Sequence, residues 1–147
     1  MNKKWNDKYN QRDLQRLRGL RLMDDDFMSK CFENNIECTE LVLHIVLGRD
    51  DLKVEKVETQ HLIKNLQGRS IILDIYATDH TGKRYNIEIQ RADRGAGAKR
   101  ARYHSSLIDA NITEPGDRLE NLSETYVIFI TERDVMGDAL PIYHINR

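Results

Sequence analysis

The chain has 147 residues, of which 39% are hydrophobic and 32% are charged. This length is typical of one domain with a buried core. Its 23 basic and 24 acidic residues nearly cancel, so net charge does not indicate a nucleic-acid-binding protein, and such a role would depend on local clusters of charge. The two cysteines fall in apolar helical contexts, the amino terminus lacks the apolar core of a signal peptide, and no run is long enough for a membrane span. We therefore expect a cytoplasmic protein.

The first third of the chain predicts helices. Residues 1–23 are polar and charged, and a weak leucine stripe interrupted by Gly19 predicts a loose arm or a marginal helix. Three aspartates, Asp24–Asp26, then stand where negative charge favours the start of a helix. An apolar stripe from Phe27 to Phe32 follows at helical spacing.

A second helix is expected from Glu37 to Leu47, ended by Gly48. Its apolar residues recur at the spacing of a core-facing stripe. That stripe comprises Cys38, Leu41, Val42, Ile45 and Val46.

Strands dominate the remainder of the chain. Alternating apolar residues predict a first strand over 52–60, and a hairpin follows over 70–90. A third helix is expected over 98–110, and the continuous apolar run over 125–131 is typical of a buried central strand. A last strand is predicted over 141–145. This order predicts an α/β fold with a mixed sheet and helices on its faces.

The hairpin has a register that can be derived by hand. A three-residue loop, His80-Thr81-Gly82, with the glycine in the left-handed region pairs Asp79 with Lys83. Apolar pairs then share one face: Leu73 with Ile89, Ile75 with Ile87, and Ala77 with Tyr85.

The other face of the hairpin carries acids, because Asp74 falls opposite Glu88 with Gln90 one step along. Opposed β-carbons are about 5 Å apart, so the two carboxylates repel unless a cation lies between them. A hard divalent cation with oxygen ligands would relieve that repulsion. Two alternatives stay open: the acids could be solvated on a wet face, and a turn shifted by one residue would separate them.

A basic run follows Gln90 directly. It comprises Arg91, Arg94, Lys99, Arg100 and Arg102, set against Asp93. The glycines at 95 and 97 precede the expected third helix, whose free N–H groups could hold a phosphate oxygen. Most basic helix faces are simply solvated. A site that cleaves a polyanion, however, needs cations on its flanks, and this run begins one residue after the proposed metal site.

Taken together, these segments resemble the PD-(D/E)XK nuclease superfamily. Asp74, thirteen intervening residues and then Glu88-Ile89-Gln90 look like its core motif. The resemblance is to the branch called PD-(D/E)XK nuclease family transposase, related to recombination-promoting nucleases. It rests on an ordered series of segments: Asp24–Phe32, Thr59-Gln60, Gly68–Asp74, Tyr85–Arg91, Lys99–Tyr103 and Tyr126–Glu132. The series covers most of residues 24–147 and is more specific than the short motif.

The resemblance implies a restriction-endonuclease-like fold and Mg²⁺-dependent cleavage of DNA phosphodiester bonds, in which Mn²⁺ could substitute. It makes Asp74 and Glu88 metal ligands, joined by the backbone carbonyl of Ile89, and places Gln90 where lysine is usual. Glutamine cannot supply the charge of lysine, but it can orient the attacking water. A helical acid completes such sites. The sequence does not choose among Asp25, Asp24 and Glu40.

The same resemblance makes DNA the expected partner and no membrane is expected, with a homodimer left open. The residues expected to steady the flanking phosphates are Arg91, Lys99, Arg100 and Arg102. Family members usually run past this chain's end, so we expect a charged arm over 1–23 and a nuclease-like domain over 24–147 that is cut short at its carboxyl end. The alternative is a catalytically inactive nucleic-acid-binding or structural domain that retains the nuclease fold.

Overall fold

The computed structural model describes residues 10–21, 23–91 and 95–146, and in this range the side chain of Asp25 is also outside the description. The elements, in chain order, are α2 (Gln11–Gly19), α3 (Asp25–Phe32), α4 (Ile36–Leu47), β1 (Val54–Ile63), β2 (Ile71–Asp79), β3 (Arg84–Gln90), α5 (Ala98–Ile112), the 3-10 turn η1 (Leu119–Asn121) and β4 (Thr125–Thr131). The predicted helices and hairpin are therefore present.

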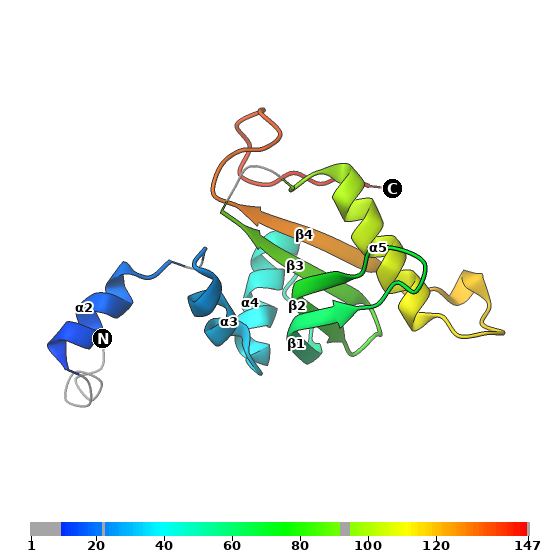
Figure 1. Cartoon of the computed structure of the whole chain (residues 1–147), viewed down its shortest axis with the longest axis horizontal. Helices are drawn as coiled ribbons and strands as arrows, with labels where there is room; N and C mark the ends of the chain where they lie inside the picture. Colours follow the sequence, from blue (N-terminus) through cyan, green and yellow to red (C-terminus); the bar gives the residue numbers. More distant parts are fainter. Residues whose placement is uncertain (1–9, 22, 92–94, 147) are drawn as a thin grey trace.

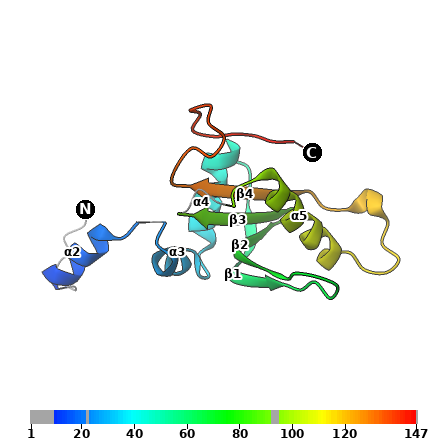
Figure 2. The same cartoon turned by 45° about the horizontal axis from the view of Figure 1, so that its top comes forward.

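The four strands form one mixed sheet in the order β1-β2-β3-β4. The β1–β2 and β2–β3 pairs are antiparallel, and β3–β4 is parallel. Helices α3 and α4 cover one face of the sheet, and α5, which connects β3 to β4, covers the other (Figures 1 and 2). This arrangement confirms the predicted α/β fold with helices on both faces.

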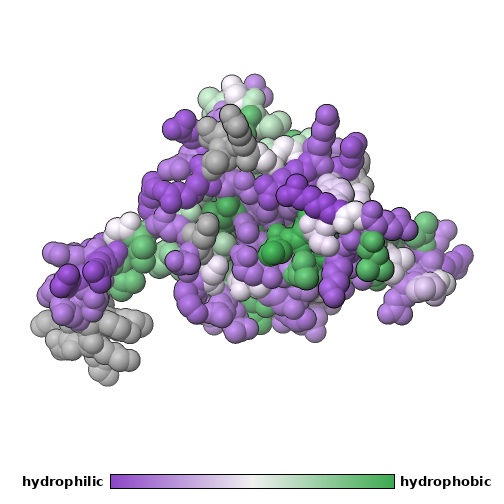
Figure 3. All heavy atoms as spheres, viewed as in Figure 1, coloured by the Kyte–Doolittle hydropathy of each residue, from purple (hydrophilic) through white to green (hydrophobic). Residues whose placement is uncertain are grey.

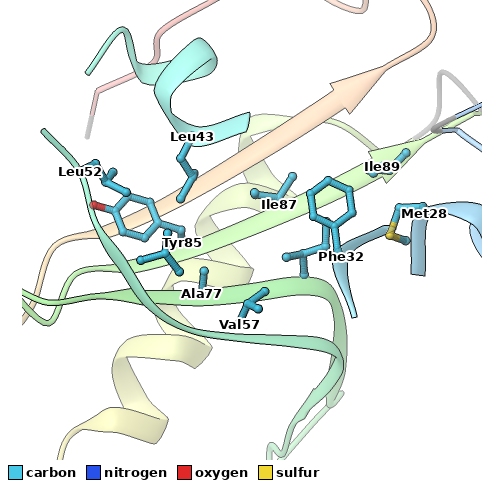
Figure 4. Close-up of a cluster of buried hydrophobic side chains, with 11 residues drawn as sticks. Met28, Phe32, Leu43, Leu52, Val57, Ala77, Tyr85, Ile87 and Ile89 are labelled. Carbon is cyan, nitrogen blue, oxygen red and sulfur yellow. The ribbon is translucent and has the colours of Figure 1, made fainter. Parts of the chain in front are cut away.

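Each face of the sheet has its own apolar core. On the α3/α4 face, Phe32 and Leu43 lie in one buried cluster with Tyr85 and Ile87, as Figure 4 shows, and Ile75 belongs to the same cluster. On the α5 face the buried cluster is smaller. It comprises Ile63, Ile71, Leu73, Tyr76, Leu107 and Ile108. The larger core anchors α3, whose first residues lie beside the carboxyl end of β3.

Strand β4 was expected at the centre of the sheet, and this prediction was wrong, because β4 lies at an edge beside β3. Its continuous apolar run has a different cause. Ile128 and Ile130 pack against the α3/α4 core, while Phe129 lies against His104 of α5. Both faces of β4 are therefore covered although one edge is open.

The predicted core-facing stripe of α4 was also wrong in part. Leu41 and Ile45 are 59% and 65% exposed, whereas Thr39 and Leu43 are buried. The Thr39 hydroxyl donates to the backbone carbonyl of Asn35 at 3.0 Å, so this polar side chain enters the core with its hydrogen bond made. The buried face of α4 is therefore rotated about the helix axis from the face that carries the predicted apolar stripe.

At the chain's two ends, the structure differs from a simple expectation. The leucine stripe near the amino terminus does form a helix, α2, capped by the Asn10 side chain on the Arg12 N–H, and α2 buries no residue. The last strand, predicted over 141–145, is not formed. In the described part of the chain, no helix combines the length and apolarity that crossing a membrane requires.

Candidate functional site at the open end of the hairpin

The turn of the β2–β3 hairpin forms as predicted. Gly82 has φ +86°, its N–H donates to the Asp79 carbonyl at 2.9 Å, and the Asp79 N–H donates to the Lys83 carbonyl at 3.1 Å. The pairs Ile75 with Ile87 and Ala77 with Tyr85 are confirmed. Local turn chemistry thus fixes the register of this hairpin.

Beyond Ile75 the backbone ladder between β2 and β3 stops. Side chains take over: the Ile89 N–H donates to Asp74 Oδ2 at 2.9 Å, and the Asp74 N–H donates to Glu88 Oε1 at 3.3 Å. The expected pairs of Leu73 with Ile89 and Asp74 with Glu88 are absent from the ladder. Meanwhile β3 stays paired with β4 as far as Gln90. The two strands therefore part where the acids lie.

Glu88 is buried and ion-paired at this open end. Its side chain is 1% exposed, and Oε2 accepts from Arg100 Nη2 at 2.9 Å. Burial, and then the charge of Asp74, raise the pKa of Glu88 to about 7, although Arg100 opposes the shift. The two acids are thus electrostatically coupled, and ionising both of them costs free energy.

Arg100 is enclosed by other groups besides Glu88. Its Nε donates to His104 Nε2 at 3.3 Å, and its guanidinium lies 5.6 Å from the centre of the Phe129 ring. Burial, and then the charge of Arg100, lower the pKa of His104 to about 4, so this imidazole is neutral at neutral pH. Arg100 is therefore a fixed neighbour of the acid and not a freely solvated cation.

The neutral His104 also contacts Asn86. His104 accepts from Arg100 on Nε2, so its single ring proton lies on Nδ1, which is 2.9 Å from the Asn86 amide nitrogen. The Asn86 Oδ1 atom is buried without a partner. Turning the amide by 180° would place this oxygen on the His104 Nδ1–H, but it would move the amide nitrogen into the position without a partner and take it away from Glu88, to which it also donates.

A hollow opens beside Asp74, between α3 and the ends of the strands. Oxygen-bearing side chains line it from three segments: Asp26 and Ser29 of α3, Gln60 and Asp74 of the first two strands, and Gln90 of β3. Ile89 and Met28 complete the lining, whereas Glu88 is turned away toward α5. Among the described residues, no three His, Cys, Asp or Glu side chains form a group that could hold a metal ion.

The helical acids named from the sequence fall in different places. Glu40 accepts from Lys53 Nζ at 2.8 Å and from the Val54 N–H at 2.9 Å, so it anchors the start of β1. Val54 lies six residues before Gln60, roughly 20 Å along the strand, which removes Glu40 from the hollow. Asp24 accepts from the Arg21 N–H. Asp25 opens α3, and its side chain lies outside the described residues.

The basic run is divided between ion pairs and solvent. Arg91 Nη1 lies 3.2 Å from Asp24 Oδ1, and Arg100 pairs with Glu88 as described above. Lys99 and Arg102 are exposed on α5, and Arg94 lies outside the described residues. The structure brings Lys99, Arg100 and Arg102 onto the helix that approaches the open end.

Sequence reasoning missed Asp26 and the pair formed by Asn86 and His104. A usable signal existed for the pair: Asn86 precedes Glu88 by two residues on the same strand face, and His104 follows Arg100 by four residues on one helix. For Asp26 none existed, because three consecutive aspartates point in three directions around a helix.

Comparison with known proteins identifies a family for the chain. The sequence model of one family, described as PD-(D/E)XK nuclease family transposase, matches residues 25–144. A search of curated proteins and a search of solved structures each gave no significant match. Because the family match spans most of the chain, the protein belongs to the PD-(D/E)XK nuclease family transposases, and its mixed sheet with flanking helices is consistent with their restriction-endonuclease-like fold.

Proposed function

We propose that this PD-(D/E)XK nuclease family member hydrolyses DNA phosphodiester bonds with the help of a divalent metal ion, at the open end of the β2–β3 hairpin. One observation carries the proposal. Where the ladder stops, the Asp74 carboxylate accepts from the Ile89 N–H, and the Glu88 carboxylate accepts from the Asp74 N–H. These crossed hydrogen bonds hold two acids side by side, next to a hollow that Gln90 also lines.

The donor types at this end suit a hard cation, although Glu88 is turned toward Arg100 and would have to turn toward Asp74 to share the ion. Asp74 lies close enough for its charge to raise the pKa of Glu88, and a cation would relieve this repulsion. Asp74 and Glu88, with the backbone carbonyl of Ile89, would hold the ion, with Mg²⁺ expected and Mn²⁺ as a substitute. When bound, such an ion supplies positive charge for the phosphoryl oxygen and for the attacking water.

Gln90 and Asp26 are the other polar groups proposed to act in the hollow. The Gln90 amide can both donate and accept hydrogen bonds, so it can orient a water molecule without carrying charge. Asp26 reaches the hollow from α3, and we propose it as the helical acid in place of Glu40. Asp25 remains a second proposal from the same helix.

The DNA backbone would be held by the exposed basic residues near this end, Lys99 and Arg102. Arg91 is paired with Asp24 at 3.2 Å while both side chains are partly exposed, and such pairs are weak enough to exchange for a phosphate. Arg100, fixed against Glu88, would instead supply positive charge behind the acids.

A plasmid-nicking assay with Mg²⁺ or Mn²⁺ tests the proposal. We expect Asp74→Asn to lower the nicking rate by roughly 100-fold or more, since it removes a charged ligand while keeping the shape of the side chain. Asp26→Asn should also slow nicking. Glu40→Gln is the matched control, because Glu40 is a helical acid outside the hollow, and it should nick at the wild-type rate. Wild-type rates for Asp74→Asn, with its circular dichroism unchanged, would overturn the site assignment.

An inactive DNA-binding domain is the second candidate, and the Arg100–Glu88 ion pair favours it because it occupies one acid. Calorimetric titration with Mn²⁺ separates the two functions. A nuclease should bind the ion in a manner that Asp74→Asn abolishes, whereas an inactive domain should bind DNA and show no such metal binding.

A further inference from the structure

A second polar hollow lies at the other end of the sheet, where the loop from α5 to β4 folds back past the start of β3. This loop carries η1 and projects beyond the carboxyl end of α5 in Figure 1. Arg84, Arg118, Asn121 and Ser123 are among the hydrogen-bonding residues that line the hollow. On the face seen in Figure 3 most of the surface is hydrophilic, and hydrophobic residues lie in small separate groups.

Arg84 is the unusual member of this set. Its Nη1 donates to the Thr78 hydroxyl at 2.8 Å, but its Nε is buried and has no hydrogen-bond partner. Among the described residues, no carboxylate lies within ion-pairing distance of its guanidinium. A partly buried guanidinium that has no anion beside it and no acceptor for its Nε–H is costly.

The only other buried side-chain polar atom without a partner in the described residues is Asn86 Oδ1, on an amide whose nitrogen is already hydrogen-bonded. Arg84 differs because every guanidinium nitrogen is a donor, so only an acceptor can satisfy it. Two acids lie nearby, and neither forms an ion pair with Arg84. Asp117, which also lines the hollow, accepts from the Glu114 N–H at 2.8 Å, and Asp109 accepts from the Thr125 hydroxyl at 2.9 Å.

We propose that this hollow binds a phosphate group, with Arg84 as its principal ligand and Arg118 at its rim. Phosphate offers several strong acceptor oxygens, and once the Arg84 side chain turns its buried Nε toward the hollow, Nε and an Nη atom can engage two of them at once. Arg118 is highly exposed and makes only a 3.7 Å contact with Glu120, so it can turn toward such an anion. Asn121 and Ser123 provide further neutral donors at the same hollow.

The phosphate group could belong to DNA or be free in solution. Arg84 and Gln90 are the first and last residues of β3, so roughly 20 Å separates the two hollows along the strand. That length corresponds to about six base pairs of duplex. A longer DNA could therefore reach this hollow while engaging the open end of the hairpin. Binding of free phosphate, by contrast, does not depend on the proposed nuclease function.

Two binding measurements on the full chain test the proposal. The first follows inorganic phosphate by calorimetry and by the melting temperature at constant ionic strength. The second follows a labelled 20-base-pair duplex by fluorescence anisotropy across a salt series without divalent metal. Each is made on wild type, Arg84→Gln and Arg84→Lys. Arg49→Gln is the matched control, since Arg49 is an arginine already paired with Asp51 at 2.8 Å.

We expect Arg84→Gln to weaken binding in at least one measurement by roughly 10-fold, Arg84→Lys to lose less, and Arg49→Gln to match wild type. Loss confined to inorganic phosphate identifies a free anion as the ligand. A weaker duplex affinity with a salt slope reduced by about one identifies a backbone phosphate. If Arg84→Gln does not fold, Arg118→Gln at the exposed rim is measured instead and should weaken the same binding. Unchanged binding of both probes in a folded variant would overturn the proposal, and neither result depends on DNA cleavage.

Discussion

Each end of the β2–β3 hairpin holds a buried carboxylate, and the groups that surround the two carboxylates differ. At the turn, Asp79 is 2% exposed and accepts four hydrogen bonds: two from Thr81, one from the Lys83 N–H and one from the Tyr85 hydroxyl. At the open end, Glu88 is 1% exposed and lies beside a second acid. Both side chains are almost inaccessible to solvent, but Glu88 lies deeper among other groups and its partners differ.

The pKa values of these two acids move in opposite directions for that reason. Burial alone would raise the pKa of Asp79, but hydrogen bonds from Thr81 and Tyr85 hold it below its usual value. For Glu88, burial and the neighbouring charge of Asp74 prevail over Arg100 and raise the pKa to about 7. The turn thus uses its carboxylate to stabilise the fold, whereas the open end keeps an acid whose charge costs stability, as functional sites commonly do.

The largest expected effect on stability comes from removing the Asp79 carboxylate at the turn. Asp79→Ala leaves two backbone N–H groups and two hydroxyls without their acceptor, and should lower the free energy of unfolding by about 4 kcal/mol. Urea denaturation at pH 7 measures this loss. A loss under about 1 kcal/mol would mean that water replaces the carboxylate without difficulty.

The isosteric change Asp79→Asn tests the same comparison through the pH dependence of stability. Because the folded-state pKa of Asp79 lies below its unfolded value, its contribution is present above about pH 4 and is lost as pH falls through the folded-state pKa. The Asn variant should start less stable at pH 7 and lose less stability on acidification. An unchanged acid slope would show that other carboxylates account for it.

The next effect concerns the open end and has the opposite sign. The pKa of Glu88 is raised from 4.5 to about 7 in the folded state, so wild-type stability is full below about pH 4.5 and is lost as pH rises through 7. Glu88→Gln removes that loss and should raise the free energy of unfolding at pH 8 by up to about 3 kcal/mol. Unfolding measured with a chelator present checks this. A variant less stable than wild type at pH 8 would show that the Arg100 ion pair outweighs the cost of burial.

The same contrast explains what the sequence could and could not predict. The turn followed from residues close together in the chain, because Gly82 supplies positive φ and the loop length sets the register as far as Ile75 and Ile87. The open end did not follow. There the ladder is replaced by side-chain bonds to Asp74 and Glu88, and α5 brings Arg100 from a distant part of the sequence.

Helix orientation was the second limit of prediction. Apolar spacing predicted that α4 exists and where it ends, but its buried face includes Thr39 and leaves Ile45 exposed. In the same way, the rotation of α3 about its axis determines which of its acids lines the hollow, and that acid is Asp26. A sequence lists which acids lie on a helix, but the rotation that selects one of them comes from packing against the sheet.

The smallest effect compares one glycine at each end of the hairpin. Gly82 and Gly95 both have positive φ, at +86° and +117°, so either change to alanine should cost about 1 kcal/mol of stability. An added Cβ at Gly82 meets only Ser123 Oγ at 3.8 Å, whereas one at Gly95 would lie 2.7 Å from Arg100 Nη1 and 3.4 Å from Gln90 Oε1. Gly95→Ala should therefore also displace Arg100 and slow nicking per folded molecule, while Gly82→Ala should not. Equal nicking by the two variants, with their folded fractions measured by urea denaturation, would show that Arg100 need not keep its place against Glu88 for the open end to function.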